Sequence, residues 1–199
     1  TNPTANDSLN LPSHSTQHAN ANDAIEAVED YLLNGAGNAG LVLLKTQTIG
    51  TGVSSVVVSD AFNATYDNYL ITINGGVASG TTALRLSLAG ITSAGNYLSS
   101  GILIDNNSGA TSTVINTGVG FTQAGFATTA NITSRVDLQN PFLTKNKIYT
   151  SDYVAMTFPG SSGKINGYSD NAISVASFTY STVSGTLTGG TIRVYGYRK

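Results

Sequence analysis

The sequence predicts a mainly β protein: an antiparallel, jelly-roll-like β-sandwich preceded by a short N-terminal arm with one helix. From residue 41 to residue 199, apolar side chains recur with a period of two, which is the period of a strand with one buried face. Turn-forming residues interrupt this pattern at roughly ten-residue intervals, and no stretch with a helical period separates the strands. Short strands without intervening helices are typical of sandwiches and jelly rolls.

Each expected strand is bounded by turn signals such as Gly-Gly, Asn-Pro or Ser-Gly. The clearest alternation lies in residues 83–89, where Leu84, Leu86 and Leu88 are expected to face the core. Arg85 and Ser87, which lie between them, are expected to face solvent. The segments that we expect to form strands are 41–47, 53–59, 66–74, 83–89, 97–104, 112–116, 120–124, 132–138, 147–158, 164–168, 173–180 and 191–197.

The composition limits the classes of partner. Only 10% of the residues are charged, whereas Ser, Thr and Asn together account for 67 of the 199 residues. A net charge of −2 gives no basic surface for nucleic acid, so we predict no nucleic-acid partner. The longest useful apolar run is Leu41 to Leu44, far shorter than a membrane span, so we predict no membrane insertion.

The charge distribution divides the chain near residue 40. Residues 1–40, here called the arm, hold five acidic residues and no Lys or Arg, whereas residues 41–199, here called the body, carry a net charge of +3. Residues 35–40 match the pattern G-x-G-x-x-G. A dinucleotide site needs a strand before this pattern and a helix after it, and here the order is reversed. We therefore interpret residues 35–40 as a linker between the arm and the body.

A helix is expected over about residues 20–33, because Asn20 or Asn22 can cap its start and Asn34-Gly35 can end it. Residues spaced alternately by three and four form a heptad seam: Leu11, His14, His18, Ala21, Ile25, Val28 and Leu32. Such a seam favours self-association, and β-branched residues in it suit a parallel bundle, so we predict a homotrimer. The alternative is a single amphipathic helix that packs on its own body.

Metal and cofactor sites are not expected. His14 and His18 have the i, i+4 spacing of a helical metal pair, but the chain offers no Cys and no third His to complete a zinc site. Residues 105–109 (DNNSG) resemble the first half of a calcium loop without its closing Glu, so a plain turn is favoured. We therefore predict no metal and no cofactor.

The body lacks the residues that most catalytic sites use. It contains no His, no Cys and no Glu, so neither a Ser-His-Asp nor a Cys-His arrangement can form within it. We predict that the protein is not an enzyme, and a glycan hydrolase built on Asp alone remains the alternative. The body does contain nine tyrosines, whose rings suit protein or sugar recognition. The tyrosines that we select as candidates for recognition are Tyr97, Tyr168, Tyr195 and Tyr197.

Three segments resemble structural proteins of tailed bacteriophages. Residues 14–29 (HSTQHANANDAIEAVE) resemble a stretch that recurs in such proteins. Residues 62–73 (FNATYDNYLITI) and 189–197 (GGTIRVYGY) resemble the opening and closing strands of phage fibre-like β-domains. The resemblance does not extend to the middle of the body, at residues 75–185.

The resemblance implies a non-enzymatic virion protein on the surface of the phage particle, commonly a trimer with an N-terminal attachment segment and a β-sandwich head. On this hypothesis, residues 1–40 bind other virion proteins of the capsid or tail, and residues 41–199 form a fibre head that binds the host surface, with a surface glycan as a candidate receptor. Two alternatives remain open: a capsid decoration protein that cements the phage head, and a carbohydrate-binding module.

Overall fold

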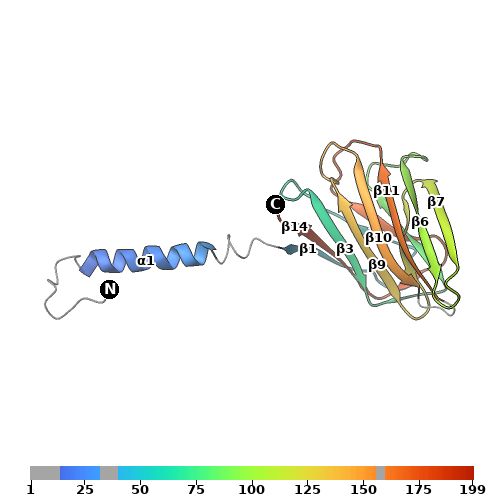
Figure 1. Ribbon diagram of the computed structural model, residues 1–199, viewed down its shortest axis with the longest axis horizontal. Helices are drawn as coiled ribbons and strands as arrows, with labels where there is room; N and C mark the ends of the chain where they lie inside the picture. Colours follow the sequence, from blue (N-terminus) through green and yellow to red (C-terminus); the bar gives the residue numbers. More distant parts are fainter. Residues whose placement is uncertain (1–13, 32–39, 156–159) are drawn as a thin grey trace. The chain divides into compact units, whose positions relative to one another are not determined.

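The computed structural model describes residues 14–31, 40–155 and 160–199. The chain divides into two compact units, residues 1–40 and 41–199. Each unit is described by itself below. The two units differ in kind, because the first contains the helix α1 and the second contains strands (Figure 1).

The helix α1 runs from His14 to Asp30, so it begins earlier than the expected start at about residue 20, and the expected end at residue 33 lies outside the described residues. The sequence pattern missed its first turns because residues 14–20 (HSTQHAN) are polar and show no apolar period. The described side chains of residues 15–31 are all exposed, including Ile25 and Val28, each 57% exposed. No helix in the described part of the chain is long and apolar enough to cross a membrane.

The body is built from strands, and each of the twelve expected segments overlaps one of them; the end of the segment 147–158 lies outside the described residues. The strands are β1 (Leu41–Thr48), β2 (Ser55–Val58), β3 (Asn68–Asn74), β4 (Val77–Ala78), β5 (Thr82–Leu88), β6 (Tyr97–Asp105), β7 (Thr111–Gly118), β8 (Phe121–Ala127), β9 (Ile132–Gln139), β10 (Lys147–Ala155), β11 (Ser161–Ser169), β12 (Phe178–Thr182), β13 (Leu187–Thr188) and β14 (Thr191–Tyr197). The short strands β4 and β13 were not expected, because two residues are too few to show a period.

One predicted boundary is wrong by several residues. The segment 173–180 was expected to be one strand, but β12 begins only at Phe178. The residues before it are bound to a loop instead: Val175 N donates to Pro141 O at 2.9 Å, and Ser174 Oγ donates to Phe142 O at 2.6 Å. These hydrogen bonds hold the backbone out of the sheet although its side chains alternate.

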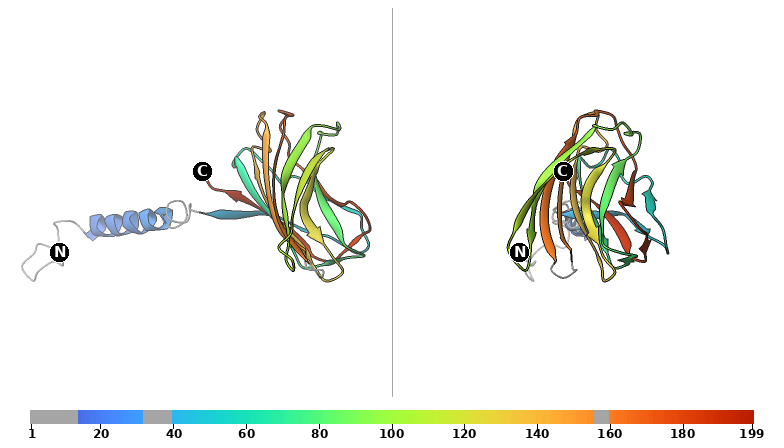
Figure 2. Two further views of the ribbon diagram at one scale, coloured as in Figure 1. Left: turned by 45° about the vertical axis from the view of Figure 1, so that its right-hand side comes forward. Right: turned by 90° about the vertical axis from the view of Figure 1, so that its right-hand side faces the viewer.

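The described strands pair antiparallel throughout and form two layers, apart from β4 and β13, which pair with each other in a separate two-stranded sheet. The larger layer has the order β1-β14-β3-β9-β10-β11-β6-β7, and the smaller has the order β2-β12-β5-β8. The start of β9 also pairs with the end of β8, which links the layers. Figure 1 shows β3, β9, β10, β11, β6 and β7 side by side, and Figure 2 shows the body from two further directions. The prediction of a mainly antiparallel β fold is confirmed, and the arrangement is consistent with a β-sandwich.

The side chains between the layers form one apolar core. Leu84, Leu86 and Leu88 are buried as the alternation predicted. Aromatic rings pack against one another within it: Phe121 stacks on Tyr149 with ring centroids 4.3 Å apart and meets Tyr97 edge-on at 4.8 Å. Full burial of such a ring stabilises the fold by about 2 to 3 kcal/mol, so these contacts weigh more than exposed ion pairs do.

Lys147, at the start of β10, is fully buried. Its ammonium donates to the backbone carbonyls of Leu143 at 2.8 Å, Lys145 at 2.5 Å and Ile173 at 2.5 Å. Burial lowers the pKa of this ammonium below its ordinary value. Because the three acceptors come from two separate loops, Lys147 joins the loop before β10 to the segment before β12.

We expect Lys147→Met to lower the free energy of unfolding by about 2 kcal/mol, because the carbonyls lose charge-assisted hydrogen bonds. Urea unfolding at pH 7 measures this loss. The matched control is Lys145→Met, which removes an exposed ammonium two residues away and should change stability by less than about 0.5 kcal/mol. Equal effects of the two substitutions would contradict a structural role for the buried ammonium.

Candidate functional site

The face of the larger layer that is turned away from the core, here called the outer face, is the candidate site. Register fixes which side chains share it: Ile148, Tyr168 and Leu98 are cross-strand neighbours on β10, β11 and β6. One step further along the strands, Thr150, Asn166 and Ser100 form the next row. The third row consists of Asp152, Lys164 and Ile102. The outer face is therefore a grid with an apolar and aromatic end and a charged end.

A groove of about 770 Å³ lies at the charged end. Ile102, Ile104 and Val154 contribute aliphatic side chains that are each about half exposed. Lys164 Nζ lies 3.5 Å from Asp152 Oδ1, and Arg135 Nε lies 4.0 Å from an oxygen of Asp137. Three of these four side chains are about half exposed or more, and Asp137 is partly buried, so each pair contributes less than about 1 kcal/mol to stability. Arg135, Asp152 and Lys164 line the groove, and their charges are available to orient a partner of mixed polarity there.

Two smaller hollows lie at the uncharged end, one on each side of Tyr168. The hollow toward β10 measures about 530 Å³ and is lined by Asn146 and Ile148 as well as by Asn166 and Tyr168. The hollow toward β6 and β7 measures about 230 Å³ and shares Asn166 and Tyr168 with the first. Tyr168 is 46% exposed, so its ring is accessible to a ligand from both hollows.

The other candidate tyrosines occupy different environments. Tyr97 was selected for recognition, but it is 1% exposed and its hydroxyl accepts a hydrogen bond from Leu88 N at 2.8 Å. Because its ring contacts only the core, Tyr97 is removed from the candidate site. Tyr195 and Tyr197 are half-buried on the outer side of β14, while Ile192 and Val194 fill the core side of that strand.

Tyr197 is tied to the outer face by a hydrogen bond from its hydroxyl to Asp137 Oδ1. Burial and the neighbouring Asp137 carboxylate raise the pKa of Tyr197 to about 12. The hydroxyl therefore remains protonated at neutral pH and acts as a fixed donor to Asp137. This contact leaves Tyr197 less suited than Tyr168 to bind an external ligand.

The segments that resemble phage fibre domains lie next to each other. β3 and β14 pair antiparallel over six residues, from Tyr69↔Gly196 to Asn74↔Thr191. Gly196 allows the Tyr66 ring to approach closely, because a Cβ at that position would lie 2.5 Å from ring atoms. The opening and closing strands of the resemblance therefore form one packed unit.

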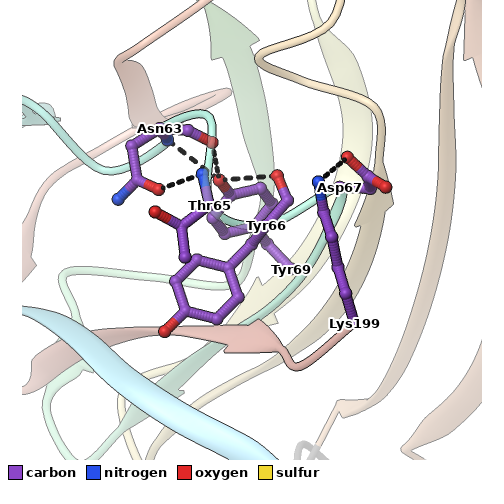
Figure 3. Close-up of polar contacts among 6 residues, drawn as sticks. All are labelled: Asn63, Thr65, Tyr66, Asp67, Tyr69 and Lys199. Carbon is purple, nitrogen blue, oxygen red and sulfur yellow. Dashed lines mark hydrogen bonds and ion pairs between the residues drawn. The ribbon is translucent and has the colours of Figure 1, made fainter.

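A polar network supports this unit where β3 begins (Figure 3). Asn63 N donates to the Tyr69 hydroxyl at 2.9 Å, and that hydroxyl donates to Asn63 O at 2.8 Å. Thr65 N donates to Asn63 Oδ1 at 2.9 Å. Lys199 forms an ion pair with Asp67 at 2.9 Å, which ties the C-terminus to the same turn. Because these hydrogen bonds and the ion pair join groups of the protein to one another, we interpret the network as structural.

The structure describes only some of the residues of the heptad seam. His18, Ala21, Ile25 and Val28 lie in α1 with exposed side chains. Leu11 and Leu32 lie outside the described residues, as does the side chain of His14, although His14 begins the helix. Among the described residues, no group of three or more His, Cys, Asp or Glu side chains could hold a metal ion.

The segment 105–109 forms a turn stabilised by its own groups. Asp105 Oδ1 accepts hydrogen bonds from Ser108 N at 2.7 Å, Ser108 Oγ at 2.8 Å and Asn107 N at 3.0 Å. The bonds from Ser108, followed by that from Asn107, hold the pKa of the Asp105 carboxyl below its ordinary value. This carboxylate is directed at the backbone of its own loop, which is the geometry of the plain turn favoured by the sequence.

The comparisons with known proteins give no family assignment. No protein-family model matches the chain, and no curated protein matches it significantly. The function must therefore be inferred from the residues and their geometry.

Proposed function

We propose that this chain is a non-enzymatic structural protein on the surface of a tailed-bacteriophage particle. Residues 1–40 anchor it to capsid or tail proteins and hold three copies together, and residues 41–199 form a displayed jelly-roll-like head that binds the host surface. The observation that carries this proposal is the outer face, which combines half-exposed aliphatic and aromatic side chains with three hollows on a rigid sheet. Solvent-exposed apolar surface of this kind typically marks a binding site.

The helix α1 supports self-association. Ile25 and Val28 lie three residues apart in the heptad seam, and each exposes more than half of its surface. An isolated helix of 17 residues is marginal in water, so a bundle that buries this seam would stabilise it. Acidic residues at Asp23, Glu26 and Asp30 lie away from the seam, where they do not oppose association.

We expect the full chain to sediment as a trimer at micromolar concentration in analytical ultracentrifugation. Replacing both Ile25 and Val28 by Asp should give monomers, because three copies would then place six carboxylates in the seam. The matched control is Ala27→Asp, which adds a carboxylate on the opposite side of the helix and should leave the trimer intact. A monomeric full chain at this concentration would exclude the trimer.

The location on the particle is tested by immunogold electron microscopy with antibody against the body. Label confined to the tail is the result expected for a fibre head, and it directs further work to host-cell adsorption. Label spread over the capsid would instead identify a decoration protein, and deletion of residues 1–20 should then abolish virion binding. Absence of label from every particle would overturn the proposal and favour a carbohydrate-binding module.

A further inference from the structure

Tyr168 is the centre of an uncharged platform on the outer face. Its cross-strand neighbours are Ile148 on β10 and Leu98 on β6, and Ile148 is itself 45% exposed. The ring separates the hollows of about 530 and 230 Å³. A planar aromatic surface supported by aliphatic side chains binds ligands that present an apolar face.

Asn166 adds a positioned polar group beside the ring. It lies two residues before Tyr168 on β11 and lines both hollows. Thr150 Oγ1 donates to Asn166 Oδ1 at 3.1 Å, which orients the side-chain amide. With Oδ1 engaged in this way, Nδ2 is the group that can donate to a ligand. Ser100, the cross-strand neighbour of Asn166 on β6, supplies an exposed hydroxyl in the same row.

Among the residues that the structure describes, no charged side chain lines either hollow. The nearest charges in the grid are Asp152 and Lys164, one row beyond Thr150 and Asn166, and they already pair with each other. An ionic ligand at Tyr168 would lose solvation without gaining a counter-charge, so this platform favours a neutral ligand.

The geometry of the platform also favours a small ligand over a protein. Stable protein interfaces bury about 1,200 to 2,000 Å², whereas ligand sites are typically hollows of about 300 to 1,000 Å³ with a few placed polar groups. Of the two hollows that flank the ring, the one of about 530 Å³ lies within the range of ligand sites and the one of about 230 Å³ lies slightly below it, so both are far closer in size to a ligand site than to a protein interface. A pyranose ring presents C–H groups on one face and hydroxyls around its rim, so it matches an aromatic surface edged by amides and hydroxyls.

We infer that Tyr168 and Asn166 form a binding site for a neutral glycan. One sugar ring stacks on Tyr168, and its hydroxyls accept from Asn166 Nδ2 and exchange hydrogen bonds with Ser100. Thr150 is a positioning residue, because it acts on the ligand only through Asn166. This inference rests on the proposed function, since it names the class of host-surface molecule that the head would bind.

Isothermal titration calorimetry on the full chain tests the inference. The probes are neutral hexose and N-acetylhexosamine oligosaccharides, with sialylated and uronic-acid oligosaccharides as charged counterparts. We expect binding of at least one neutral probe. Tyr168→Ala should weaken it by about tenfold or more, and Tyr168→Phe, which keeps the ring, by less than about threefold. Asn166→Asp, which replaces the donor by a carboxylate, should weaken it comparably to Tyr168→Ala.

Tyr31→Ala is the matched control, because it removes a tyrosine that is 63% exposed directly after α1 and should leave binding unchanged. Thermal unfolding of each variant shows whether its fold is retained. Three outcomes would overturn the inference. They are binding of charged probes alone, binding that Tyr168→Ala leaves unchanged, and no binding of any neutral probe at millimolar concentration.

The two proposals fail in distinguishable ways. Label on the phage tail without glycan binding would leave the virion role standing and remove the glycan site. Tyr168-dependent glycan binding without label on any particle would keep the site and overturn the virion role.

Discussion

Raising the pH above 10 should unfold the body over a narrow range. Burial raises the pKa of Tyr97 and of Tyr153 to about 12, and it raises the pKa of Tyr149 and Tyr180 as well. In the unfolded chain these hydroxyls ionise near pH 10. Their contribution to stability is therefore complete below pH 10 and is lost as the pH rises from 10 toward the folded pKa values.

The expected size of this effect is large. Each hydroxyl that stays protonated only in the folded state lowers the free energy of unfolding by about 1.4 kcal/mol per pH unit. Four such hydroxyls give about 5 kcal/mol per pH unit, which is comparable to the total stability of many domains. Lys147 acts in the opposite direction, because its lowered pKa makes stability rise with pH until the unfolded lysine is also neutral. One lysine offsets only a fraction of the loss.

Urea unfolding at pH values between 8 and 11.5 measures the pH dependence. The matched variant is Tyr153→Phe, because the buried Tyr153 hydroxyl has no hydrogen-bond partner in residues 14–31, 40–155 and 160–199. Its removal should leave stability at pH 8 almost unchanged and reduce the slope above pH 10 by about one fifth, since Tyr197, whose pKa is also about 12, contributes besides the other three buried hydroxyls. A free energy of unfolding that stayed constant to pH 11.5 would contradict the effect.

The sequence was sufficient to predict most strands, because alternation and turn residues are local signals. It was not sufficient to predict which side of β6 faces the core. Leu98, Ile102 and Ile104 face outward although they are apolar, while the small residues Ser99 and Gly101 lie on the core side together with Tyr97 and Leu103. A Cβ at Gly101 would lie 2.8 Å from Ile165 Cα, so close packing of β11 requires glycine there.

The candidate site could not be predicted from spacing along the chain. Tyr168 was one of four selected tyrosines, and nothing local separated it from Tyr97. The difference arises from pairing, because Tyr168 meets Ile148 and Leu98, which are 20 and 70 residues distant in the sequence. Asn166 was not selected at all. Its importance follows from the hydrogen bond with Thr150 on the neighbouring strand, which a single sequence does not reveal.

Gly76→Ala should lower the free energy of unfolding by about 3 to 4 kcal/mol. Gly76 has a φ of +80°, which non-glycine residues rarely adopt, and a Cβ there would lie 2.3 Å from Gly189 O. The left-handed backbone costs about 1 to 2 kcal/mol with a side chain present, and overpacking adds about 1 to 3 kcal/mol. The overlap cannot be relieved by rotating a side chain, since the opposing atom belongs to the backbone.

Two further glycines separate the causes of this loss. Gly52 has a φ of +65° with open space around its would-be Cβ, so Gly52→Ala should show the conformational cost alone, about 1 to 2 kcal/mol. Gly80 has open space and no left-handed φ, so Gly80→Ala should be neutral within about 0.5 kcal/mol. Urea unfolding should show the largest loss of unfolding free energy for Gly76→Ala, a smaller loss for Gly52→Ala and the smallest for Gly80→Ala. If Gly76→Ala lowered the free energy of unfolding no more than Gly52→Ala does, the turn after β3 and the turn before β14 would not be in backbone contact.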